Sequence, residues 1–374
     1  MIKYLTQRVL LAIFTIFAIA IIVFFLVAYF AENPFVKEWE NSGFKAEQAE
    51  SVFQRSKDTY LIKPDTEFSR FEPLAWIDKK ESVFVRFGYW VKSVFDSNQP
   101  FGFVFNQNIL SNADVKTIPA YFFRFLPYSL IITLPSFLIS ASLGIFLGII
   151  AGYKRGKFFD WIVNLLSQFF VALPIFVTAS VVILVLLSVF GTPPLFLLPR
   201  DIEINGLSNT IASWASPIFV VVIGSLAGYI TFVRNQVVTV LTSNYVLSAK
   251  SKGLNQRQIF FKYVLRNISI PLAATLIPSY IGLLSGGVVI ETYWRVPGVS
   301  NVIVNAFPNG EINIIMFSTV FFTTLSVFTT IIVDISFVFL DPRIRYYSSS
   351  TSLLFLFKQY LVRNKEKKLA QAKN

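Results

Sequence analysis

Long, uninterrupted apolar runs constrain this chain more than any other feature. A helix that crosses a membrane needs about 20 largely apolar residues, because the hydrocarbon core of a bilayer is about 30 Å thick. Several runs reach that length, while only 14% of the residues are charged. We therefore predict an all-α membrane protein with six transmembrane helices. The predicted spans are 9–30, 127–152, 161–190, 214–233, 268–290 and 313–340.

Two of these spans need a further argument. The first follows Lys3 and Arg8, as a signal peptide would, but its apolar run is longer than an h-region and no A-x-A-like site follows. We expect residues 1–30 to be a retained helix. The third contains Leu173-Pro174, and we expect the proline to be tolerated there because neighbouring helices can satisfy the freed carbonyl.

The distribution of lysine and arginine predicts the orientation. Short loops on the cytoplasmic side are enriched in these residues. With the N-terminus inside, the inner segments hold 19 of the 33 basic residues and only four of the 21 acids. Both termini are therefore expected in the cytoplasm. The net positive charge of the chain is explained by this distribution across the membrane, so no nucleic-acid partner is needed to account for it.

Two segments lie outside the predicted spans. Residues 31–120 form an extracytoplasmic segment of mixed charge, within which 81–95 has the pattern of an amphipathic helix. It is either a folded cap on the membrane surface or a docking surface for a partner that delivers substrate. Residues 347–374 form a basic cytoplasmic tail, with a short amphipathic helix expected to lie on anionic lipid.

Several kinds of chemistry are absent from the sequence. There is no histidine or cysteine, which removes the commonest acid–base catalyst, thiol nucleophiles and thiolate metal sites. Gly156-Lys157 lacks the first glycine of a P-loop and is followed by Phe158. Within the predicted spans only Asp334 is ionisable, whereas proton and ion pathways are usually marked by such residues. We predict no catalysis, no metal site and no cofactor in this chain.

Gly144, Gly148 and Gly152 recur every four residues along the second span. This spacing lines one helix face with small residues and allows another helix to approach closely. We predict helix packing there, with pore lining as the alternative.

The inner segment 234–267 is longer than a simple connection requires. Its pattern predicts a helix capped near 242–244, a break at Gly253, and a second helix begun by an Asn255/Gln258 capping box. Ala249 and Gly253 would leave a notch on an exposed helix. Physical reasoning leaves two interpretations open: a helix lying on lipid headgroups, or a helix inserted into a groove on a cytoplasmic protein.

This segment resembles the "EAA" coupling loop of ABC-importer permeases. Ser248-Ala249, three spacers and Gly253 match its core, with Leu247 in place of the glutamate, and Ile268-Ser269-Ile270-Pro271 resembles its distal part. Other stretches resemble the B-type permease subunit of oligopeptide/dipeptide importers, over about 1–30 and 83–346. They are MIKYLTQRVLLAIFTIF, LGIFLGIIAGYKRGKFFD, IETYWRVPGVSNVIVNAF and VDISFVFLDPRIR.

The resemblance implies a type I ABC importer permease fold, with a five-helix core at 121–346 and an extracytoplasmic insertion after the first helix. It implies a multi-pass subunit of the cell membrane that pairs with a homologous C-type permease, two cytoplasmic ATPases that bind ATP and magnesium, and an extracytoplasmic peptide-binding protein. It also implies which residues contact the ATPase. They are Tyr245, Ser248, Ala249, Lys250, Lys252, Gly253, Leu254 and Arg257.

Two other functions are compatible with the residues themselves. One is a sodium-coupled carrier lined by carbonyls and hydroxyls, and the other is a membrane-anchored scaffold or receptor that binds through 31–120. Peptide preference and the residues lining the pathway are not specified by the sequence, although Asn164, Gln168 and Ser285 are polar candidates.

Overall fold

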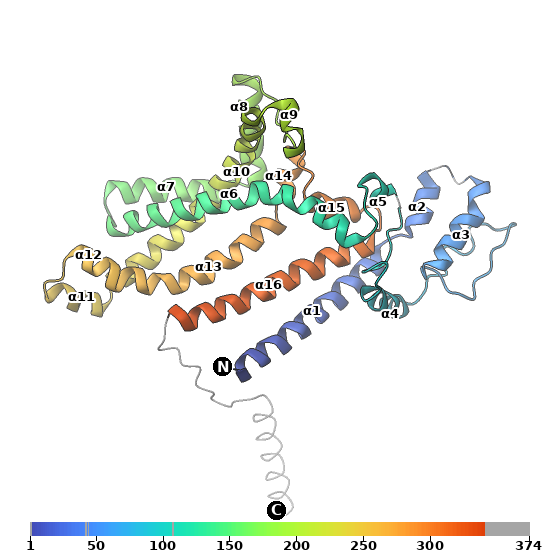
Figure 1. Ribbon diagram of the computed structural model, residues 1–374, viewed down its shortest axis with the longest axis horizontal. Helices are drawn as coiled ribbons and strands as arrows, with labels where there is room; N and C mark the ends of the chain where they lie inside the picture. The colour runs from blue at the N-terminus through green and yellow to red at the C-terminus, as the bar shows by residue number, and fades with distance from the viewer. Residues whose placement is uncertain (1, 42, 44, 107, 341–374) are drawn as a thin grey trace, which may run out of the picture.

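The computed structural model describes residues 2–340 except 42, 44 and 107. Over these residues the chain is helical and contains no strand, only one antiparallel bridge between Ile62 and Lys80. Five helices are long and apolar enough to cross a membrane, and they lie in a layered bundle (Figure 1). They are α1 (Ile2–Phe30), α6 (Ile118–Tyr153), α10 (Leu207–Leu241), α13 (Leu265–Ser285) and α16 (Ile312–Leu340). The all-α membrane fold is thus confirmed, whereas the tail predicted at 347–374 lies outside the described residues.

The third predicted span is two helices rather than one. α7 (Phe158–Ala172) and α8 (Ile175–Val189) meet at Leu173-Pro174 and are bent by 99°. Proline disfavours the helical conformation in the residue before it, and Leu173 is extended, with φ −80° and ψ 120°. The apolar run predicted as the third span, 161–190, is therefore broken at the proline that the prediction expected it to tolerate. The pair counts as a sixth span only if the bent unit crosses as a whole.

The three glycines spaced by four residues lie where α6 packs against α10. A Cβ added at Gly148 would lie 2.8 Å from the Val233 Cβ and 2.9 Å from the Ile230 carbonyl oxygen. Added Cβ atoms at Gly144 and Gly152 would likewise overlap Tyr229 and Val237. The two helices approach closely along this seam because no side chain separates their backbones.

Replacing Gly148 with alanine is expected to destabilise the folded chain, by about 1–3 kcal/mol, because the methyl group would push α6 and α10 apart. Gly228→Ala on α10 is the matched control, since its added Cβ would meet no atom within 4 Å. Thermal unfolding of the purified variants would compare them. Equal melting temperatures for the two variants would contradict close packing at Gly148.

The insertion between α1 and α6 folds against the bundle. It contains α2 (Pro34–Asn41), a 3-10 turn (Ala46–Gln48), α3 (Ala49–Asp58), α4 (Val83–Val94) and α5 (Asn108–Asn112). The amphipathic helix predicted at 81–95 is confirmed as α4. The apolar core of the insertion includes Trp39 and Trp76 and continues into Phe24 of α1 and Met316 of α16. The insertion is therefore built onto these two helices.

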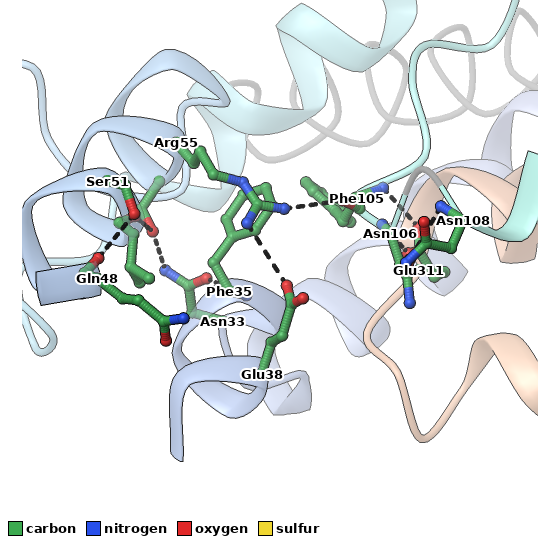
Figure 2. Close-up of polar contacts among 12 residues, drawn as sticks. Asn33, Phe35, Glu38, Gln48, Ser51, Arg55, Phe105, Asn106, Asn108 and Glu311 are labelled. Atoms are coloured by element: carbon green, nitrogen blue, oxygen red, sulfur yellow. Dashed lines mark hydrogen bonds and ion pairs between the residues drawn. The ribbon is translucent and has the colours of Figure 1, made fainter. Parts of the chain in front are cut away.

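Polar contacts fasten the insertion to the start of α16 (Figure 2). The fully buried Glu311 carboxylate accepts hydrogen bonds from the backbone N–H groups of Phe105 (2.9 Å) and Asn106 (2.7 Å). The Arg55 guanidinium lies 4.2 Å from the Phe35 ring centroid and donates to the Phe105 carbonyl oxygen at 3.3 Å. Segments distant in sequence are thus joined beside Phe105.

Glu311 makes the stability of this contact depend on pH. Burial raises the pKa of its carboxyl from 4.5 to about 7, although the two backbone donors favour the charged form. Between these pH values the folded chain retains a proton that the unfolded chain has released. The free energy of unfolding therefore falls as pH rises through this window, by on the order of 3 kcal/mol at about 1.4 kcal/mol per pKa unit.

Glu311→Gln is expected to flatten this pH dependence, because the side chain no longer titrates. Melting temperatures measured across that window would show it. The exposed Glu38, which lies 3.5 Å from Arg55 in the same region, provides the control variant Glu38→Gln. A pH profile unchanged in Glu311→Gln would exclude Glu311 as its source.

Candidate functional site

The candidate coupling loop between α10 and α13 folds as two short helices with a glycine break. α11 (Asn244–Ser251) ends before Gly253, which has φ +80°. α12 (Gln256–Ile259) starts at a complete capping box, in which Asn255 and Gln258 exchange hydrogen bonds of 2.9 and 3.0 Å. The predicted helix–break–helix is confirmed. Ser243 occupies the N-cap of α11, although its side chain makes no capping hydrogen bond.

Both short helices are anchored by buried aliphatic side chains. Val246 of α11 and Ile259 of α12 are 0% and 3% exposed, and they pack in one cluster with Val237 and Val240 of α10. Val264 and Ile268 complete the cluster from the side of α13. The loop is therefore a folded element seated on the ends of two long helices.

The predicted contact residues do not all face outward. Ala249 is 3% exposed because it lies one helical turn after Val246, on the face of α11 packed against the cluster. The notch predicted at Ala249 and Gly253 is thus wrong for Ala249, while a Cβ at Gly253 would point into open space. Leu254 is partly buried. The exposed members of the predicted set are Tyr245, Ser248, Lys250, Lys252, Gly253 and Arg257.

The exposed face combines cationic and apolar side chains. Leu247 is 51% exposed and Phe261 is 65% exposed, close in sequence to the exposed Lys250, Lys252 and Arg257. Neither apolar side chain was predicted as a contact residue. Exposed leucine and phenylalanine beside cations are suited to burial against a protein surface.

The loop is directly continuous with a long helix. α12 passes into a π-helical turn (Phe260–Val264) and then into α13 without an intervening coil. Tyr263 in this turn stacks on Tyr245 of α11, with ring centroids 6.2 Å apart. A displacement of α11 and α12 would therefore be passed to α13.

An ion pair missed in the sequence braces the base of this region. The Arg234 guanidinium of α10 donates to both carboxylate oxygens of Asp160 in α7, at 2.9 and 2.8 Å. Asp160 also accepts from the Gly156 N–H at 2.9 Å and from the Asn164 amide at 2.6 Å. The side chain of Asp160 is only 5% exposed and that of Arg234 is 21% exposed. The only sign of this ion pair in the sequence was the position of Asp160, a single acidic residue at the end of the basic stretch KRGKFFD.

A second buried carboxylate organises the opposite end of the core. Glu291 lies within α14 (Val288–Tyr293). Its carboxylate accepts hydrogen bonds of 2.9 and 3.1 Å from the N–H groups of Ser300 and Asn301, in the first turn of α15 (Val299–Ala306). Ser129 of α6 donates to it at 2.6 Å. A Cβ at Gly298 would overlap the carboxylate. The stretch IETYWRVPGVSNVIVNAF, which contains Glu291, was one of those that resemble the permease family, but no role was predicted for Glu291.

Two of the three polar candidates noted in the spans bond within the chain, and the third, Gln168, is exposed on α7. The Asn164 amide is held by Asp160, and the Ser285 hydroxyl donates to the Ile281 carbonyl at 2.9 Å. Asp334 of α16 pairs with Arg8 of α1 at 3.0 Å. These contacts join helices or satisfy a helix's own backbone, and they assign no residue to a substrate pathway.

Comparison with known proteins agrees with this architecture. Residues 144–346 match the family of binding-protein-dependent transport system inner membrane components. The oligopeptide transport system permease protein OppB of Mycoplasma genitalium is 31% identical over 363 residues, 96% of this chain and 81% of that protein. The dipeptide transport system permease protein DppB of Lactococcus lactis is 27% identical over 349 residues, 92% of this chain and 100% of that protein.

These matches confirm the resemblance drawn from the loop and span motifs. The family match includes α10, the whole candidate coupling loop and α13, and the match to the Mycoplasma protein covers nearly the full chain. The chain is an all-α, multi-pass membrane permease that belongs to the family of inner membrane components of binding-protein-dependent transport systems.

Proposed function

We propose that this chain is one transmembrane subunit of an ATP-driven oligopeptide importer and forms half of its translocation pathway. A homologous C-type permease would form the other half. Two cytoplasmic ATPases would bind ATP and magnesium and hydrolyse the nucleotide, and an extracytoplasmic binding protein would deliver the peptide. The permease itself performs no chemistry.

The observation that carries this proposal is the candidate coupling loop. It is folded and anchored by Val246 and Ile259, yet it presents Tyr245, Leu247 and three cations outward. A loop that lay only on lipid headgroups would need cations, but it would not need two rigidly anchored short helices joined to α13. Such a loop suits the transfer of a push from an ATPase to the spans, because each short helix is fixed to a long one.

The proposed orientation has both termini and this loop in the cytoplasm. Figure 1 shows α11 and α12 at the same end of the bundle as the turn between α6 and α7, which carries Lys154, Arg155 and Lys157. Clustering of short basic loops at one end supports a cytoplasmic location for that end. The insertion lies toward the opposite end, where it would meet a binding protein.

Purification of the tagged chain from its own membranes tests the proposal. We expect a second permease and two ATPases to co-purify in defined stoichiometry. A chain that transports when reconstituted alone would instead be an ion-coupled carrier. A chain that purifies alone and transports nothing would be a scaffold or receptor, and either result would overturn the proposed function.

A further inference from the structure

Helix α4 of the insertion packs against the side of α1 instead of standing beyond its end. The Phe87 ring of α4 lies 5.3 Å from the Phe24 ring and 6.2 Å from the Phe17 ring of α1, measured between centroids. Phe84 of α4 lies 4.8 Å from Phe25. These contacts fix how far along α1 the helix lies.

The contacts lie at membrane depth. Tyr29 and Phe30 close α1 with exposed rings, as expected of residues at the boundary between hydrocarbon and headgroups. At 1.5 Å per residue, Phe24 lies about 9 Å and Phe17 about 20 Å below Phe30 along the helix. The hydrocarbon core is about 30 Å thick. Phe87 contacts both rings, so it lies beside α1 between these two depths, at about the middle of the bilayer, and α4 lies within the hydrocarbon.

The outward face of α4 suits that environment. Phe84 is 75% exposed and Val85 is 43% exposed, and Gly88 is exposed one turn later, whereas the Tyr89 ring stacks on Tyr60 of the insertion. There is no acidic residue in the helix. An interfacial helix normally turns its apolar face into the membrane and its charged face to water. Here one face packs on α1, and the face left open is also apolar.

The two cations of α4 fit the same placement. Arg86 is partly buried, and its guanidinium donates to the Ala28 carbonyl at 3.3 Å, in the last turn of α1, where carbonyls lack helical partners. Lys92 is exposed near the end of α4, from which a long side chain can extend its ammonium toward the headgroups. The Arg86 guanidinium therefore does not face hydrocarbon without a partner.

We propose that α4 is seated in the hydrocarbon beside the C-terminal half of α1, with Phe84, Val85 and Gly88 against lipid acyl chains. The occupant of this face is lipid because Phe84 packs on Phe25 of α1, a helix that itself exposes the apolar side chains of Ile22 and Leu26. The insertion is then partly a membrane-embedded element, and only its remaining helices face water. This inference requires that α1 spans the membrane, but not that the protein imports peptides.

Site-directed spin labelling tests the placement, because the chain has no cysteine of its own. Single variants Val85→Cys and Gly88→Cys would be labelled in the full-length chain, with any subunits that co-purify, in lipid vesicles. A Cβ at Gly88 would meet no atom within 4 Å, so this label should not disturb α4. Gln54→Cys on the exposed face of α3 is the control.

The readout is access of each label to dissolved oxygen, which concentrates in hydrocarbon, and to a water-soluble nickel chelate. We expect high oxygen and low nickel access at 85 and 88, and the reverse at 54. High nickel access at 85 and 88 would show a water-facing helix and overturn the proposal. Low access to both reagents would show that protein covers this face, which would also overturn it.

Discussion

Gly253→Arg is expected to abolish peptide uptake while leaving the permease in the membrane. Gly253 has φ +80°, and a Cβ there would point into open space beside the exposed face of α11. A residue other than glycine in this conformation costs about 1–3 kcal/mol, which a folded membrane protein can tolerate. The arginine side chain would then occupy the volume in which we propose that the ATPase binds. Uptake of labelled peptide and the ATPase activity of the purified complex would be measured together.

Gly206→Arg separates the backbone effect from the contact. Gly206 has φ +79°, and a Cβ there would also meet no atom within 4 Å, but it lies between α9 (Ile202–Asn205) and α10, distant from the loop. Its variant should suffer at least as much conformational strain, because ψ at Gly206 is 147°, a region occupied almost only by glycine, and it should still support uptake. If both variants transport normally, Gly253 is not at the coupling contact. If both fail, strain alone is sufficient to explain the loss.

Asp160→Ala is expected to be the most destabilising single change at the base of the loop. It would leave the Arg234 guanidinium largely buried without its bidentate partner, and breaking a buried pair on one side costs roughly 3–5 kcal/mol. Because Arg234 retains 21% exposure, we expect the lower end, about 3 kcal/mol. The thermal midpoint of the purified chain would report the loss.

Two further variants test the electrostatic origin of that loss. The double variant Asp160→Ala/Arg234→Ala leaves no unpaired charge, and it should be more stable than Asp160→Ala alone. Asp201→Ala breaks a surface pair with Arg200, whose side chains are 37% and 68% exposed, and should cost no more than about 1 kcal/mol. Additive losses in the double variant would show that Asp160 acts through packing.

Local signals explain why the sequence predicts the coupling loop well. The Asn255/Gln258 capping box and the break at Gly253 depend only on neighbouring residues, so they could be predicted without knowledge of the fold. The direction in which the Ala249 side chain points could not be predicted, because it depends on the apolar cluster that α10 presents to α11. The prediction placed Ala249 on an exposed face of α11. Val246, one turn earlier on the same face, is buried in the cluster, so that face packs against the protein instead.

Contacts between distant segments were beyond the reach of a single sequence. Asp160 pairs with a residue 74 positions away, and Glu311 receives hydrogen bonds from residues more than 200 positions earlier. Hydropathy located the third apolar run but could not give its 99° bend, because proline in a membrane helix is compatible with either a kink or a break. The spans could therefore be predicted, while the partners that hold them together could not.

The attachments of the insertion have a mechanical consequence. Near one end, α1 and α16 are tied by Arg8 and Asp334. Near the other, the insertion bonds to both, through Arg86 at the Ala28 carbonyl and through Glu311 at Phe105. Two helices joined near both ends cannot slide past each other, so we expect α1, α16 and the insertion to move as one rigid body. If the chain moves as the proposed function requires, we expect that motion to take place between this body and the rest of the bundle.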